Sequence, residues 1–192
     1  MELAATIVIA YLLGSIPTSY VIVYLTTGTN VRRVGNGNPG TMNVWENVGF
    51  WAGLLVALGD IGKGAAAVGV AYAMGFGDIE AVAAAFAAVI GHDFSIFLRL
   101  HGGNGTAAAL GGMVALVPLA AVPMIAIAIA LYQLTTRKRL IGAIGLAMVP
   151  VAAYWLGYNE VKVIGVLVLL VGVGLKVVRF EGLTPDRFRP PR

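Results

Sequence analysis

The sequence predicts an all-α integral membrane protein, and its composition and apolar runs are the basis of this prediction. Of the 192 residues, 59% are hydrophobic and only 11% are charged, whereas about 25% of the residues in a typical soluble domain are charged. The mean hydropathy is +0.88. Runs of about 18 or more apolar residues recur along the chain, and a bilayer core of about 30 Å requires roughly 20 residues of α-helix. A soluble fold is therefore excluded.

The apolar runs divide the chain into its predicted elements. They cover residues 3–25, 50–76, 79–98, 106–134, 140–158 and 161–178. No cysteine is present, which excludes disulfides, thiolate metal ligands and a cysteine nucleophile. Residues 1–180 are predicted to form one polytopic membrane domain, and residues 181–192 a short basic, proline-containing cytoplasmic tail.

Basic residues between the runs predict how the chain crosses the membrane. They occur at Arg32 and Arg33, at Arg99, in the cluster 137–139 and from Arg179 onward. The segments after the second run and after the fifth run are acidic or nearly neutral instead. Because cytoplasmic loops carry an excess of Lys and Arg, the basic segments are placed in the cytoplasm. The amino terminus then lies outside and the carboxyl terminus inside.

The fourth run, residues 106–134, must cross an even number of times because both of its flanks are basic. As one helix it would be about 43 Å long, which exceeds a single perpendicular crossing. Pro118 and Pro123 interrupt it, and proline breaks or kinks a helix. We therefore predict a short helical hairpin, roughly 106–117 and 119–134, and seven transmembrane helices in all. A single tilted helix, which would give six, is the alternative and breaks the charge rule at one end.

Two glycine-rich segments on the predicted cytoplasmic side are candidate phosphate sites. In the first, VGNGNPGTMNV, the glycines satisfy G-x-G-x-x-G, but a membrane helix precedes them where a dinucleotide site requires a strand. Glycine turns can still direct several backbone N–H groups at one anion, and a flexible connecting loop is the alternative. The candidate binding residues here are Gly35, Asn36, Gly37, Asn38, Gly40 and Asn43.

The second segment, HGGNGTAAALG, leads directly into the predicted start of a helix. Helix amino termini present unpaired N–H groups and a positive dipole end, so phosphate is a suitable ligand. Thr106 is expected to cap this helix and to offer its hydroxyl. The candidate binding residues are Gly102, Gly103, Asn104, Gly105 and Thr106.

Charged residues within the apolar runs are the remaining candidates. Asp60 and Lys63 are spaced i, i+3 on one helix face, and His92 and Asp93 interrupt the third run. Charges in a membrane span usually face a protein interior or a polar cavity. A structural salt bridge and a packing histidine are the alternatives. Together with the loops, these residues indicate a polar cavity with hydrophobic walls, which suits an amphiphile with a phosphate head.

The order and spacing of these pieces resembles the bacterial acyl-phosphate:glycerol-3-phosphate acyltransferase family. The resemblance is carried by AYLLGSIPTSYVI, VGNGNPGTMNV, GDIGKG, GHDFSIFL and HGGNGTAAALG. It implies seven membrane helices in the cell membrane and the transfer of a fatty acyl group from acyl phosphate to glycerol 3-phosphate. The product would be lysophosphatidic acid for phospholipid biosynthesis. No metal, no cofactor and no nucleic acid partner is implied.

On this interpretation the protein mainly positions two anions for direct attack by the substrate hydroxyl, without a covalent intermediate. The second loop, with Lys63 and either Arg99 or Arg137, holds phosphate, and the first loop forms the opposite wall. Asp60 is placed in the same site, and His92 is the candidate for proton transfer.

The chain also departs from the pattern of the family. Asn36, Glu46, Asn104 and Gly142 stand where the family has a serine, an arginine, a lysine and a serine, and LKVVRFEG replaces a histidine and asparagine cluster. A second function therefore stays open. It is a non-catalytic lipid-phosphate binder or transporter, a relative that has kept the cavity and lost the chemistry.

Overall fold

The computed structural model describes residues 1–134 and 138–181, and this part of the chain contains helices and no strand. The α-helices are α1 Glu2–Ser15, α2 Thr18–Thr27, α3 Thr41–Asn47, α4 Phe50–Ala73, α5 Asp78–Asp93, α6 Thr106–Leu116, α7 Pro118–Leu134, α8 Lys138–Trp155 and α9 Glu160–Glu181. Two short 3₁₀ helices are η1 Val31–Arg33 and η2 Ile96–Leu98. The predicted all-α class is confirmed.

Several of these helices have the length and composition of membrane spans. Within the described ranges, three stretches are long and apolar enough to cross a bilayer, namely Glu2–Thr27, Phe50–Ala73 and Asp78–Leu98. Shorter apolar helices cover Thr106–Leu116, Pro118–Leu131 and Ile141–Trp155. Helices of this kind, packed side by side, are what a multi-pass membrane protein requires.

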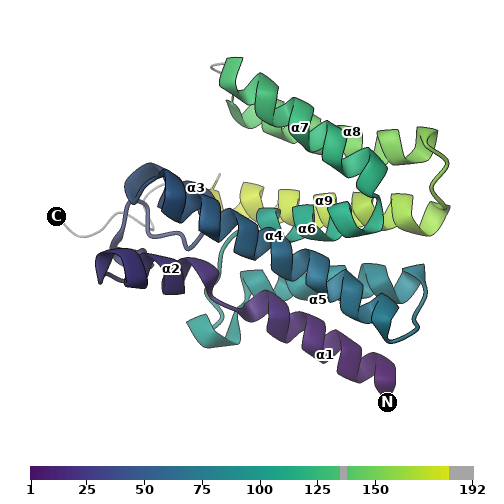
Figure 1. Ribbon diagram of the computed structural model, residues 1–192, viewed down its shortest axis with the longest axis horizontal. Coiled ribbons are helices and arrows are strands. Elements are labelled where there is room, and N and C mark those ends of the chain that lie inside the picture. Colours follow the sequence, from purple (N-terminus) through teal and green to yellow (C-terminus); the bar gives the residue numbers. More distant parts are fainter. Residues whose placement is uncertain (135–137, 182–192) are drawn as a thin grey trace.

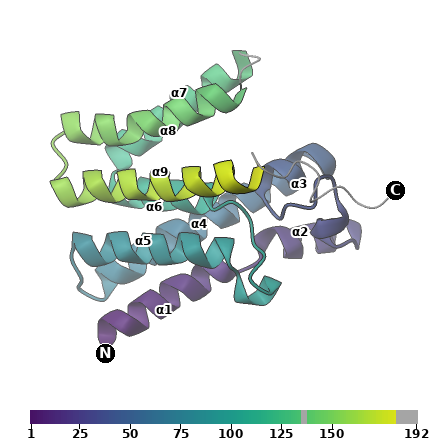
Figure 2. The ribbon, with the colours of Figure 1, turned by 180° about the vertical axis from the view of Figure 1, so that it is seen from behind.

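The chain runs back and forth between two ends of an elongated bundle (Figures 1 and 2). One end, here called the loop end, carries both glycine-rich segments, residues 28–49 and 94–105. The opposite end, here called the far end, carries the amino terminus, the turn between α4 and α5 and the turn between α8 and α9. The two glycine loops are thus brought to the same end by helices that separate them in sequence.

The run 106–134 forms two helices that lie in opposite directions, α6 leading away from the loop end and α7 returning to it (Figure 1). The break falls at Val117, and Pro118 is the first residue of α7, a position that proline favours because its missing N–H would be unpaired there anyway. Pro123 lies inside α7 without ending it. The predicted arms therefore match α6 and α7 to within one residue.

The first run was expected to be a single helix, and this is wrong. It is broken at Ile16 and Pro17 into α1 and α2, because proline has no N–H to continue the helical ladder. The break has a consequence for the interior, since the carbonyl oxygens of Ser15 and Ile16 accept hydrogen bonds from Ser95 at 2.6 Å and from Lys63 at 3.1 Å.

Small residues allow the helices that carry these polar groups to approach closely. A Cβ at Gly14 in α1 would overlap the backbone of Ala88 in α5, and a Cβ at Gly64 in α4 would overlap the backbone of Ala108 in α6. The core around them consists largely of alanine and valine. Close packing through small residues is typical of membrane helices, and here it holds α1 against α5 and α4 against α6.

Candidate functional site

A buried cluster of charged side chains lies near the loop end, between α4 and α5. Asp60 Oδ1 is 2.8 Å from Lys63 Nζ and 3.6 Å from His92 Nδ1. Asp60, Lys63, His92 and Asp93 are all at most 8% exposed. The i, i+3 spacing thus places Asp60 and Lys63 on one helix face as an ion pair, and the packing of α5 on α4 adds the histidine.

A small cavity of about 10 Å³ adjoins this cluster, which is roughly the space of one water molecule. Its walls come from the break between α1 and α2, from Pro39 of the first loop, from the Asp60 and Lys63 face of α4, and from Ser95 and Gly103 beyond α5. Within the described ranges, Oδ2 of Asp60 and Nδ1 of His92 are buried and make no hydrogen bond. The cluster therefore keeps polar capacity that the protein itself does not use.

The first glycine loop is organised around the side chain of Asn43. Its Nδ2 donates to the carbonyl oxygens of Val34 at 3.0 Å and Asn38 at 2.9 Å, and its Oδ1 accepts from Asn36 N at 3.1 Å. Gly35 and Gly37 have φ values of 55° and 74°, which only glycine adopts at little cost.

The expectation that this loop directs its N–H groups at an anion is wrong for three of them. The backbone N–H of Gly37 donates to Val34 O, that of Asn38 to Asn36 Oδ1, and that of Asn36 to Asn43. Gly40 directly precedes α3, and a Cβ added at this position would only reach ordinary van der Waals contact with Asn38. These three backbone N–H groups therefore hold the turns of the first loop together and do not point at a ligand.

The second glycine loop is docked onto the end of α5. The N–H groups of Gly102 and Gly103 donate to the carbonyl oxygens of Asp93 at 2.9 Å and His92 at 3.2 Å. A Cβ at Gly103 would overlap Nε2 of His92, so the absence of a side chain permits this contact. These two amides are therefore not directed at a ligand, contrary to the expectation.

The start of α6 also differs from the prediction. Gly105, with φ of 72°, is the N-cap residue, and no side chain caps the helix. Thr106 is the first residue of the helix and not its cap, because the chain needs a positive φ one residue earlier. Asn104 is half-buried between the docked glycines and this helix start.

The cations nearest the loops differ from those expected. Nη2 of Arg32, a residue regarded only as part of a basic segment, donates to the carbonyl oxygens of Leu98 at 2.6 Å and His101 at 3.0 Å, and so joins the two loops. Arg99 is exposed, with φ of 53°, and does not line the cavity. Arg137 lies outside the described residues.

The chain is similar to known proteins in both sequence and fold. The sequence profile described as Glycerol-3-phosphate acyltransferase matches residues 4–182. The chain belongs to this family. It is 34% identical over 179 residues to glycerol-3-phosphate acyltransferase 1 of Dehalococcoides mccartyi, which covers 90% of this chain and 86% of that relative. It is 39% identical over 144 residues to the glycerol-3-phosphate acyltransferase of Desulforudis audaxviator, covering 75% and 72%.

A solved structure of the acyltransferase family supports the same assignment at the level of the fold. The crystal structure of PlsY, an integral membrane glycerol 3-phosphate acyltransferase, in its glycerol 3-phosphate form superposes with a TM-score of 0.84. The sequences are 26% identical, and the match covers 100% of this chain and 96% of that one. The family resemblance predicted from the glycine loops is confirmed.

Two of the four single positions at which this acyltransferase chain departs from the family pattern lie on the surface. Asn36 and Glu46 are exposed, and Asn36 uses its Oδ1 within the first loop. Gly142 has open space where a side chain would project. Asn36, Glu46 and Gly142 thus lie outside the buried cluster of Asp60, Lys63, His92 and Asp93.

One residue of the candidate site was missed by the sequence analysis. Lys176 of α9 reaches Asp93 Oδ1 at 3.0 Å and donates to the carbonyl oxygen of Gly103. The signal was a lysine near the end of the last apolar run, since a charge in such a run usually has a partner inside the protein.

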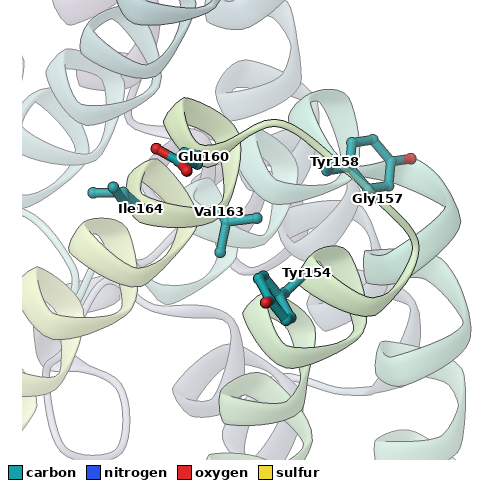
Figure 3. A pocket seen from close by; sticks show the side chains of 6 residues that line it. All are labelled: Tyr154, Gly157, Tyr158, Glu160, Val163 and Ile164. Carbon is teal, nitrogen blue, oxygen red and sulfur yellow. The ribbon is translucent and has the colours of Figure 1, made fainter.

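A larger cavity, of about 480 Å³, lies at the far end between α8 and α9. Figure 3 shows its lining, formed by Tyr154, Gly157, Tyr158, Glu160, Val163 and Ile164. The lining contains a carboxylate and no cation, so it does not suit a phosphate. Within the described ranges, no group of three or more His, Asp or Glu side chains is arranged to hold a metal ion.

Proposed function

We propose that this protein transfers a fatty acyl group from acyl phosphate to glycerol 3-phosphate at the loop end, and so makes lysophosphatidic acid for phospholipid synthesis. Membership of the family supports acyl transfer to glycerol 3-phosphate. The single observation that carries the location is the cavity between the two glycine loops, which has the ammonium group of Lys63 in its wall. A buried cation beside two glycine loops is suited to a phosphate group.

The proposed chemistry requires positioning more than a strong nucleophile. The substrate hydroxyl attacks the acyl carbon, the bond from that carbon to the phosphate oxygen breaks, and inorganic phosphate leaves. The hydroxyl proton is released as the new bond forms, and His92 is the candidate acceptor. Lys63 offsets the negative charge of the two substrates in a site of low dielectric, where a fixed cation is most effective.

The candidate binding residues are proposed in two groups. The second loop, from Gly102 through Thr106, forms the wall beside the phosphate of glycerol 3-phosphate, with Lys63 as the cation and Asp60 orienting Lys63. The amides of Gly102 and Gly103 hold this wall on α5. The first loop, from Gly35 to Asn43, forms the opposite wall. Because the cavity holds about one water molecule, substrate entry requires the loops to separate, and the connection through Arg32 is the contact that would open.

We further propose seven membrane crossings, with both glycine loops in the cytoplasm and the amino terminus outside. The basic residues at the loop end and the opposed directions of α6 and α7 support this orientation. Single cysteines at Arg33 and Lys138 should react with an impermeant thiol reagent from the cytoplasmic side, and a cysteine at Glu160 from the outer side. Labelling of positions 33 and 138 from opposite sides would contradict the hairpin.

An acyl-transfer assay on the purified protein tests the activity. Labelled glycerol 3-phosphate with palmitoyl phosphate should give lysophosphatidic acid, and palmitoyl-CoA should not replace the acyl phosphate. The double variant Asp60→Leu with Lys63→Met serves as the control that lacks the cluster. Product from the double variant at the parental rate would place the chemistry elsewhere.

The second candidate function is binding of a lipid phosphate without turnover. It is favoured by Glu46, an exposed carboxylate on α3 where the family has an arginine. A binder would retain labelled glycerol 3-phosphate in equilibrium dialysis and give no product with palmitoyl phosphate, and this result would replace the enzymatic proposal.

A further inference from the structure

We propose that Lys176 is a positioning residue of the glycerol 3-phosphate site, which holds the second glycine loop against α5 from helix α9. The proposal rests on the proposed function. It assigns a role to the last helix, which the loop motifs alone do not include in the site.

The contacts of Lys176 connect three parts of the chain. Its Nζ lies 3.0 Å from Asp93 Oδ1 at the end of α5 and donates to the carbonyl oxygen of Gly103 in the loop. It also lies 5.0 Å from the centre of the Phe94 ring, within the range of a cation–π contact. The side chains of Lys176 and Asp93 are 12% and 9% exposed. The ammonium group is thus a shielded junction between α5, α9 and the loop.

Loss of this junction would release the loop and not the bundle. The remaining attachments of Gly102 and Gly103 to α5 are two backbone hydrogen bonds. Gly103 fits against His92 only because it has no side chain, so a small displacement of the loop changes the wall of the cavity. Since Lys176 does not line that cavity, it acts on substrate through the loop.

The same helix provides a matched control at the far end. Lys162 of α9 lies 3.3 Å from Asp78 Oδ1 at the start of α5, and its Nζ is 5.8 Å from the centre of the Tyr72 ring. It therefore makes the same kinds of contact between α9 and α5, with no glycine loop attached. Loss of either lysine should weaken the packing of α5 on α9. Only loss of Lys176 should also affect the site.

The first test compares Lys176→Met with Lys162→Met in acyl transfer and in hydrogen exchange. Lys176→Met should raise KM for glycerol 3-phosphate about tenfold, the scale of one lost charged hydrogen bond, and change kcat by less than about threefold. Lys162→Met should leave both constants near the parental values. The amides of Gly102 and Gly103 should exchange faster in Lys176→Met only, because their bonds to α5 open more often.

Two further variants separate positioning from a simple contribution of charge. Lys176→Arg keeps the charge and the donors, and it should restore part of the KM and part of the amide protection. Lys176→Met combined with Asp93→Asn removes both members of the ion pair and keeps the parental net charge, and it should not recover KM, because the connection to Gly103 is still missing. Recovery in this double variant would overturn the proposal, because charge alone would then suffice.

The outcomes also distinguish this proposal from the proposed function. If the parent protein binds glycerol 3-phosphate and gives no product, the acyltransferase proposal fails and the Kd for glycerol 3-phosphate replaces KM in every comparison. If the parent does neither, the hydrogen exchange of Gly102 and Gly103 still decides. Equal protection of these amides in the parent, Lys176→Met and Lys162→Met would show that Lys176 does not hold the loop.

Discussion

The two ends of the bundle use the same kinds of polar residue in different ways. At the far end, Asp78 accepts hydrogen bonds from Tyr72 at 2.7 Å and Asn159 at 2.6 Å and pairs with Lys162. The side chains of that pair are 22% and 26% exposed, so they are also accessible to solvent. At the loop end, the side chains of Asp60 and Lys63 are only 2% and 6% exposed.

The difference indicates which end is built for stability and which for chemistry. Burial of an ion pair costs desolvation energy that its attraction often fails to recover, and a buried polar atom without a partner costs more. The far end avoids both costs, because Asp78 and Lys162 have partners and are partly exposed to solvent. At the loop end, by contrast, Asp60 is in a buried ion pair, and Asp60 and His92 each have a buried polar atom without a partner. These costs are explained if the two groups interact with something besides the protein.

The largest expected effect concerns Lys63, at the centre of the loop end. Lys63→Met leaves the carboxylate of Asp60 buried without its partner, a loss of about 3–5 kcal/mol in the free energy of unfolding. Combination with Asp60→Leu should recover much of this loss and still give no acyl transfer, because methionine offers no charge to a phosphate. Thermal unfolding in detergent and acyl transfer should be measured for the parent, both single variants and the double variant.

The distinction between a structural end and a chemical end would fail if the double variant of Asp60 and Lys63 were stable and catalysed acyl transfer at the parental rate. The ion pair would then be a structural feature like that of Asp78 and Lys162, and the buried location would have no functional meaning.

The next effect in size is expected at Gly103, where the loop meets His92. Gly103→Ala introduces a Cβ into the volume of Nε2 of His92, so either the loop or the imidazole must shift. Binding of glycerol 3-phosphate should weaken about tenfold or more, with a smaller effect on thermal stability. Isothermal titration of the variant measures this.

Gly142→Ala in α8 is the control for that substitution, since nothing lies within 4 Å of a Cβ there. Alanine is a better helix former than glycine by up to about 1 kcal/mol, so this variant should bind as the parent does and be at least as stable. If Gly103→Ala bound glycerol 3-phosphate as tightly as the parent does, the docked loop would not be part of the substrate site.

The connection between the two loops should give an intermediate effect. Arg32→Met removes the donor to Leu98 O and His101 O, and the loops should then separate more readily. We expect KM for glycerol 3-phosphate to rise about threefold, because the closed arrangement of the loops around bound substrate loses a partly exposed connection worth about 0.7 kcal/mol. Its exposed neighbour Arg33, changed to Met, is the control, and equal kinetics for the two variants would show that only the total charge matters.

The sequence was sufficient for features that depend on local periodicity and spacing. The break of the fourth run was placed at Pro118 and lies one residue earlier, because the effect of proline on a helix is local. The pair of Asp60 and Lys63 follows from i, i+3 geometry in the same way. The break at Pro17 was not predicted, because the high hydropathy of the first run also fits one continuous helix.

The contacts that complete the loop end could not be derived from local patterns. Arg32 and Lys176 both donate to backbone carbonyl oxygens, 66 to 69 residues away for Arg32 and 73 residues away for Lys176. A carbonyl acceptor has no signature in the side-chain sequence, so no spacing rule points to it. The use of loop N–H groups within the loops was missed for the same reason, since it depends on how the turns fold onto Asn43 and onto α5.

The smallest expected effect lies at the far end, and it tests whether that end affects substrate binding. Tyr72→Phe removes the hydroxyl that donates to Asp78 and keeps the ring beside Lys162. A half-exposed hydrogen bond of this type contributes less than about 1 kcal/mol, and Asp78 retains Asn159 and Lys162 as partners. The variant should therefore unfold at a temperature only slightly below that of the parent, with KM and kcat unchanged. A change in KM without a change in stability would mean that the far end is coupled to substrate binding, and the division of the bundle into a structural end and a chemical end would fail.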